Sequence, residues 1–173
     1  MQKILTYTLI FVALILLQEF AFDKINFWGL VNPYVYIMFI IMLPMETKGW
    51  MVLLFGFFTG IVIDALSGGG GLYAIATTWV AFVRPTALNF TAGRDAVQLG
   101  GVPASSQIGT AKFLAYSGGM TLLFAIPFFL LEVMSLENIG MTLLRIVASS
   151  AATVAIIYFL QLPFNRGARK RKA

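Results

Sequence analysis

The division of this chain into long apolar runs limits most strongly how it can fold. Six runs have a length and composition typical of membrane helices, namely residues 4–22, 31–45, 50–66, 72–91, 112–134 and 140–162. A helix needs roughly 20 apolar residues to cross the hydrocarbon core of a bilayer. Charged residues make up 11% of the sequence, against about 25% in soluble domains. We therefore predict an all-α, polytopic membrane helix bundle with about six transmembrane helices.

The chain is predicted to form one integral membrane domain over residues 1–165, followed by a basic tail over 166–173. We expect the first run to be a retained membrane helix, because no small-residue cleavage site for a secretory signal follows it. Basic residues beside membrane helices favour the cytoplasmic side. With six spans, a multi-pass protein with both termini in the cytoplasm is predicted.

Several classes of function are excluded by residues that the chain lacks. It contains no cysteine and no histidine, which removes disulfides, thiol nucleophiles, Cys/His metal sites and Ser-His-Asp catalysis. The net charge of +5 is concentrated in the tail, so we expect membrane lipids as partners and no nucleic acid. The glycine run after Ser67 lacks the Gly-Lys-Ser/Thr ending of a phosphate loop. We predict no catalytic residues, metal or cofactor.

Gly56, Gly60 and Asp64 recur at steps of four within the third run, and therefore lie on one face of the predicted helix. Glycines at this spacing allow another helix to approach closely, and an acid on the same stripe points toward that helix rather than toward lipid. We predict that these residues form a helix-packing seam. The neighbour is either another helix of this chain or a partner protein.

Two groups of charges are predicted from the same topology. Asp64, Glu132 and Arg145 fall near the outer helix ends, where Arg145 could pair with either acid, or Glu132 and Arg145 could simply reach the headgroups. At the inner ends of the second and fourth helices, Glu46 and Arg84 could form an ion pair or be solvated independently.

Prolines are expected to shorten or kink the helices of the second and fourth runs, and glycines to prevent a long helix in the region after the fourth. The second run is short and has a proline at each end, and the fourth is expected to kink or to end at Arg84-Pro85. The glycine-rich stretch 92–111 is expected to be a flexible inner loop. Small residues, including Ala151 and Ala155 in the last run and Gly118-Gly119 in the fifth, suggest close helix packing, either internal or with a partner.

Residues 30–90 resemble the rod shape-determining MreD family. The resemblance depends on four features in order. Asn32-Pro33-Tyr34 opens the second run, and Leu43-Pro44-Met45-Glu46-Thr47 follows at its end. The Gly-x-x-x-Gly-x-x-x-Asp-x-x-Ser-Gly pattern begins at Gly56, and Arg84-Pro85 closes the fourth run. The run of four glycines before Leu72 departs from the family pattern. The resemblance implies a fold similar to the substrate-binding subunits of energy-coupling-factor transporters.

The resemblance also implies a function. It predicts a non-enzymatic scaffold of the cell-wall elongation machinery in the bacterial inner membrane, which binds an MreC-like protein and helps determine rod shape. The further partners implied are the actin-like MreB, a glycan polymerase and a transpeptidase. Two alternatives stay open: a substrate-binding subunit of an ATPase-driven small-molecule transporter, and a membrane enzyme that uses Asp64 and Glu132 as acid and base.

Overall fold

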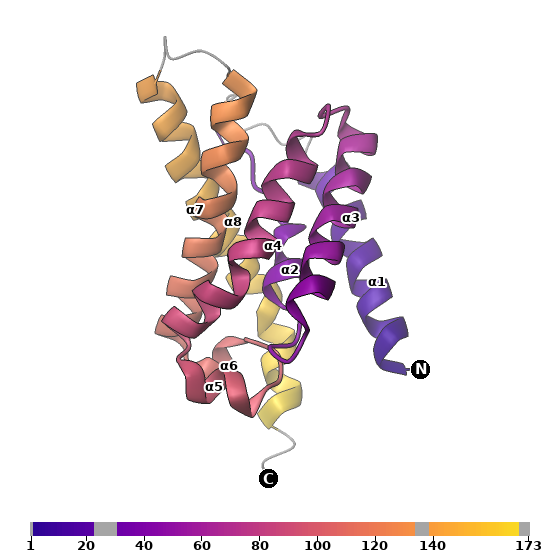
Figure 1. Cartoon of the computed structure of the whole chain (residues 1–173), viewed down its shortest axis with the longest axis vertical. Helices are drawn as coiled ribbons and strands as arrows, with labels where there is room; N and C mark the ends of the chain where they lie inside the picture. The colour runs from indigo at the N-terminus through magenta and orange to yellow at the C-terminus, as the bar shows by residue number, and fades with distance from the viewer. Residues whose placement is uncertain (1, 23–30, 134–138, 170–173) are drawn as a thin grey trace.

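The computed structural model describes residues 2–22, 31–133 and 139–169, which form helices and no β-strand (Figure 1). The elements are α1 (Gln2–Leu17), a π-helical turn η1 (Gln18–Phe22), α2 (Ile37–Ile41), α3 (Gly49–Ser67), α4 (Leu72–Thr91), α5 (Arg94–Leu99), α6 (Ser105–Ile108), α7 (Thr110–Val133) and α8 (Ile139–Arg169). The long helices run side by side. The start of α1, the end of α8 and both short helices α5 and α6 lie at the same end of the molecule (Figure 1).

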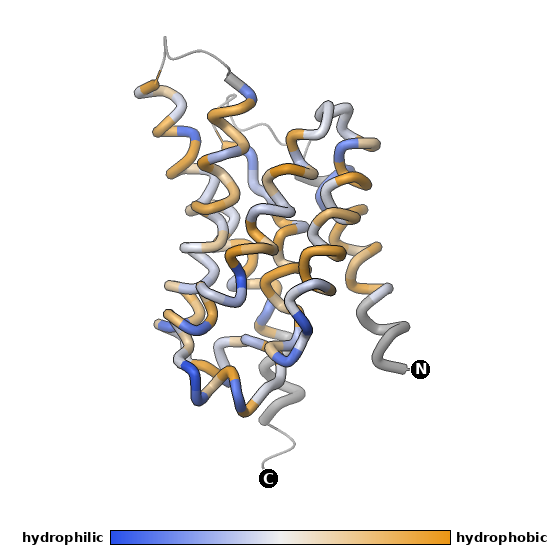
Figure 2. Tube along the Cα trace, in the orientation of Figure 1, coloured by the Kyte–Doolittle hydropathy of each residue, from blue (hydrophilic) through white to orange (hydrophobic). Residues whose placement is uncertain are grey.

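Three helices of the described part are long and apolar enough to cross a membrane: Gly49–Ser67, Thr110–Glu132 and Ile139–Leu162. A shorter apolar helix covers Thr8–Phe20. Hydrophobic residues dominate the middle of the long helices, and hydrophilic residues gather around α5 and α6 (Figure 2). The chain is therefore a membrane protein built as a helix bundle.

The prediction of a continuous helix over 31–45 was wrong. Only Ile37–Ile41 is α-helical, and residues 32–36 are irregular. Pro33 cannot donate a backbone hydrogen bond, and it also disfavours a helical conformation at the residue before it. Residues 33–43 are nevertheless buried throughout. Irregular backbone is tolerated at membrane depth when protein surrounds it, so this stretch, here called the internal segment (residues 31–45), forms the centre of the fold.

Aromatic rings fix the internal segment against α4 and α7. The ring of Tyr34 lies 4.9 Å from that of Phe124 and 5.0 Å from that of Phe128. Tyr36 meets Phe124 edge-on at 6.0 Å, and Tyr73 of α4 lies 4.7 Å from Phe128. Tilted and edge-to-face pairs of this kind add about 0.5–1.5 kcal/mol each to the burial of the rings.

Two further expectations are decided by the structure. Helix α4 covers the predicted run 72–91 and does not end at Arg84-Pro85, which excludes one of the two alternatives; neighbouring groups in a membrane bundle can satisfy the backbone that a proline frees. The stretch 92–111 is not simply a flexible loop, since it folds into α5 and α6 and buries Ala104 and Ile108.

The last helix is longer than its apolar run. Helix α8 continues to Arg169, beyond the expected end at residue 162 and into the predicted tail. The side chains of the basic tail, over residues 166–173, lie outside the described part of the chain.

Candidate functional site

Gly56 and Gly60 lie where α3 packs against α4. A Cβ atom added at Gly56 would lie 2.5 Å from the Cβ of Ala81 and 3.0 Å from the carbonyl oxygen of Thr77. One added at Gly60 would overlap the Cα of Ala74 and the hydroxyl of Thr77. The two backbones therefore approach so closely that only glycine fits. The predicted seam is internal to the chain.

Asp64 continues this seam and holds the start of α4. Its carboxylate accepts hydrogen bonds from the backbone N–H groups of Gly71 at 3.1 Å, Tyr73 at 3.2 Å and Ala74 at 2.8 Å. Gly71 is the N-cap residue of α4 and has no side chain to cap the helix. The first N–H groups of a helix lack partners within it and carry partial positive charge. Asp64 therefore caps α4 from the last turn of α3.

The glycine run between α3 and α4 allows this capping turn. Gly68, Gly70 and Gly71 have φ values of 68°, 61° and 98°, in the left-handed region that side chains disfavour. A larger residue cannot replace Gly69 for a different reason: a Cβ atom there would lie 2.6 Å from the Asp64 carboxylate. The four glycines thus serve a tight hairpin.

Polar side chains from η1 and α8 satisfy the irregular backbone of the internal segment. Gln18, at the start of η1, donates to the Pro33 carbonyl at 3.1 Å and accepts from the Val35 N–H at 2.8 Å. On α8, the Ser149 hydroxyl accepts from the Asn32 N–H and the Thr153 hydroxyl from the Tyr34 N–H, both at 3.0 Å. Gln18, Ser149 and Thr153 are buried. They replace the water that is absent at this depth.

Arg84 and Tyr116 perform the same role at the other end of the internal segment. Arg84 is only 1% exposed, and its guanidinium donates to the Leu43 carbonyl. The Tyr116 hydroxyl donates to the Ile41 carbonyl at 3.3 Å. Ile41 is the last residue of the short helix α2 and Leu43 follows it, so both carbonyls lie at the helix end where partial negative charge accumulates. The two side chains therefore anchor the end of α2 to α4 and α7.

The predicted Glu46–Arg84 pair does not form, since the two side chains have different partners. Glu46 is exposed and accepts from the Gly101 N–H at 3.1 Å, whereas Arg84 is buried within α4. Arg84 lies seven residues before the end of that helix, so it cannot be a helix-end charge. A backbone carbonyl inside the bundle takes the place of the expected carboxylate.

The predicted outer cluster is also not assembled among the described residues. Asp64 caps α4, Glu132 is exposed, and the half-buried Arg145 pairs with neither acid. The Nε atom of Arg145 is buried and has no hydrogen-bond partner within residues 2–22, 31–133 and 139–169. Glu19 instead accepts from the Ser67 hydroxyl at 3.3 Å, which connects η1 to the end of α3.

The other small residues differ from the α3 glycines. A Cβ added at Gly118 or Gly119 would meet nothing within 4 Å, so no close helix contact requires them. On α8, Ala151 and Ala155 are exposed. All four positions were expected to pack closely; the described chain covers the two glycines in part and leaves the two alanines exposed.

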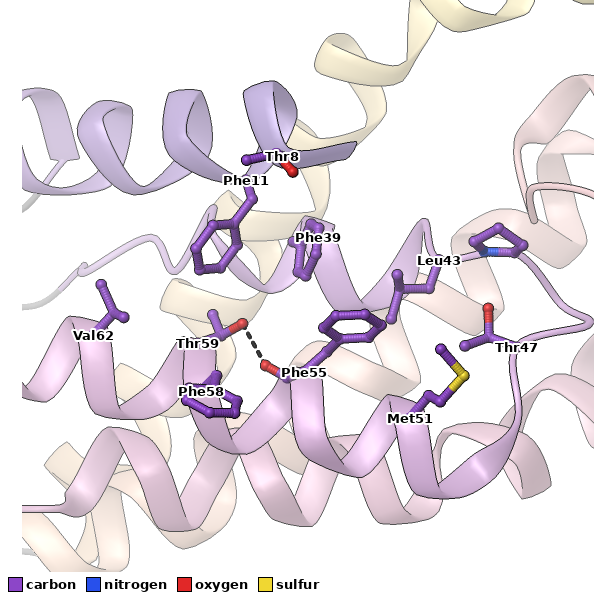
Figure 3. A pocket seen from close by; sticks show the side chains of 11 residues that line it. Thr8, Phe11, Phe39, Leu43, Thr47, Met51, Phe55, Phe58, Thr59 and Val62 are labelled. Atoms are coloured by element: carbon purple, nitrogen blue, oxygen red, sulfur yellow. Dashed lines mark hydrogen bonds between the residues drawn. The ribbon is translucent and has the colours of Figure 1, made fainter. Parts of the chain in front are cut away.

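An open apolar groove lies between α1 and α3, beside the internal segment (Figure 3). Its volume is about 490 Å³. Phe11 of α1, Phe39 of α2 and Phe55 of α3 line it. The ring of Phe39 lies 4.9 Å from that of Phe11 and 6.0 Å from that of Phe55. Among the residues that the structure describes, the lining contains no charged side chain. The groove suits an apolar occupant.

Comparisons with protein-family models, with curated proteins and with solved structures find no match to this chain. The resemblance to the MreD family and the transporter-like fold that it implies therefore remain predictions.

The sequence did not predict that four polar side chains bind the backbone of the internal segment, namely those of Gln18, Ser149, Thr153 and Tyr116. The signal was present, because polar residues inside apolar helices require hydrogen-bond partners. The partners, however, are backbone groups of a segment that was expected to be helical. In a helix these backbone groups would have bonded to one another and needed no side chain.

Proposed function

We propose that this protein is a non-enzymatic scaffold of the MreD type, which binds an MreC-like protein within the cell-wall elongation machinery. The supporting observation is that residues of the resemblance make contacts that hold the bundle together. The Asn32 N–H binds Ser149 of α8, Asp64 caps α4, and Arg84 holds the end of α2. Arg84-Pro85, however, lies within α4 and does not close it.

In the membrane we propose six crossings and cytoplasmic termini. The internal segment and α4 would complete the set formed by α1, α3, α7 and α8. The start of α1 and the end of α8 lie at one end of the bundle with α5 and α6 (Figure 1). Lys48, Arg94 and Lys112 precede α3, begin α5 and follow the start of α7, respectively. This distribution supports a cytoplasmic position for that end.

The partner helix requires a surface other than the α3 seam, which α4 already covers. On α8, Val147 and Phe159 are 61% and 68% exposed, and Ala151 and Ala155 between them are exposed as well. These four residues, here called the α8 face, recur at steps of four. Small residues flanked by larger ones permit close contact between membrane helices. We assign the single membrane helix of the MreC-like partner to this face.

The assembly that follows from this docking is the rod complex. An MreC-like protein held at the α8 face would connect the scaffold to MreB, the glycan polymerase and the transpeptidase, in the bacterial inner membrane.

Purification of the tagged chain from its own host in mild detergent, with mass-spectrometric identification of bound proteins, tests this function. We expect an MreC-like protein and wall-synthesis enzymes. Ala151→Leu should reduce their recovery, whereas Ala65→Leu, the same change at an exposed position of α3, should not. Recovery of ABC-type ATPases with a coupling membrane subunit would contradict the proposal and favour a transporter subunit.

A further inference from the structure

The groove between α1 and α3 has the dimensions of a single hydrocarbon chain. Along α3 its lining extends from Met51 to Val62, and the rise between these two residues corresponds to about 16 Å of helix. Half of a hydrocarbon core of about 30 Å is about 15 Å, which is the depth of one leaflet. The groove therefore has the length that the acyl chains of one leaflet occupy.

Its volume also suits a hydrocarbon chain. A volume of about 490 Å³ over that length gives a mean cross-section of about 30 Å². A methylene chain in contact with neighbours at about 4 Å needs about 16 Å². The groove can therefore hold an acyl chain along its length.

A basic residue follows the lining at one end of the groove. Thr47 belongs to the lining, and the next residue, Lys48, is exposed and makes no side-chain hydrogen bond or ion pair with any described residue. The neighbouring carboxylate of Glu46 is directed to the Gly101 N–H. Trp50, 62% exposed, stands at the same level, where tryptophan favours the membrane interface.

We propose that this groove binds one acyl chain of an anionic phospholipid whose phosphate lies at Lys48. The chain runs over the rings of Phe11, Phe39 and Phe55 and ends near Val62. Because α1 and α3 are separated by the groove, the lipid fills the space between them and fixes α1 to the bundle. This inference does not depend on the scaffold function.

Native mass spectrometry of the purified full chain, exchanged into mixed micelles with equal amounts of phosphatidylglycerol and phosphatidylcholine, tests the proposal. We expect one retained lipid, with phosphatidylglycerol preferred. Val62→Phe and Met51→Trp fill the groove at opposite ends and should lower lipid occupancy at least tenfold. Ile61→Phe adds a ring at the adjacent position of α3, outside the lining, and should retain the lipid. Lys48→Gln should reduce the preference for phosphatidylglycerol about fivefold, whereas Arg94→Gln should not.

Each contrary result is decisive. Absence of retained lipid in the wild-type protein, equal occupancy in Val62→Phe and Ile61→Phe, or a retained polypeptide in place of a lipid would overturn the proposal. A preference unchanged in Lys48→Gln would remove the headgroup assignment. Circular dichroism identifies a filled-groove variant that fails to fold, and the other filling variant then gives the answer.

Discussion

Gly60→Ala should destabilise the protein by about 2 kcal/mol, although alanine is the better helix former. The added methyl group would overlap the Cα of Ala74, which is backbone and cannot rotate away. Overpacking of this kind costs about 1–3 kcal/mol, and the upper end applies because α3 and α4 must separate. The higher helix propensity of alanine offsets about 1 kcal/mol of this cost, which leaves a net loss of about 2 kcal/mol. Gly118→Ala is the matched control, because nothing lies within 4 Å of the added atom.

The two variants are compared by titration with a denaturing detergent, with helix content followed by circular dichroism. We expect the free energy of unfolding of Gly60→Ala to fall about 2 kcal/mol below wild type, and that of Gly118→Ala to stay equal or rise by up to about 1 kcal/mol. If Gly60→Ala were as stable as Gly118→Ala, close contact between α3 and α4 at this glycine would be refuted.

The remaining predictions concern the same core. Gly56→Ala should be destabilising and should be partly rescued by Ala81→Gly, because the two Cβ atoms would otherwise lie 2.5 Å apart; a double-mutant cycle should give a coupling of at least about 0.5 kcal/mol, and simple additivity would argue against the contact. Asp64→Ala should cost about 1–3 kcal/mol because it removes the acceptor for the first N–H groups of α4, whereas Glu132→Ala, at an exposed position, should change stability by less than about 0.5 kcal/mol. Gln18→Leu should lower the free energy of unfolding by about 1–3 kcal/mol, since two buried backbone groups lose their partner; a smaller loss than that of Glu132→Ala would show that the internal segment does not need it.

The sequence predicted those parts of the fold that depend on local composition. The runs that became α3, α7 and α8 were located from apolar length alone, because a bilayer imposes that length on any helix. The internal segment could not be predicted in the same way. Its irregular backbone is stable only because Gln18, Ser149 and Thr153 supply hydrogen bonds from helices far away in sequence.

The candidate seam shows the same division. The spacing of Gly56, Gly60 and Asp64 identified a face in close contact with another helix, and that face does meet α4. The expected partner of Asp64 was a charged side chain. The actual partners are backbone N–H groups. Every residue except proline has one, so the sequence does not indicate which of them Asp64 binds. Arg84 illustrates the reverse case, since its partner is the Leu43 carbonyl rather than Glu46.

Because the natural chain contains no cysteine, site-specific disulfide cross-linking to the membrane helix of the MreC-like partner tests the central claim most directly. Single variants Ala151→Cys and Ala155→Cys place a thiol on the α8 face, and Ala65→Cys places one on exposed α3. The account predicts cross-links to a cysteine-substituted partner helix from both α8 positions and none from Ala65→Cys. Cross-links from α3 alone, or from no position in membranes that contain both proteins, would contradict it.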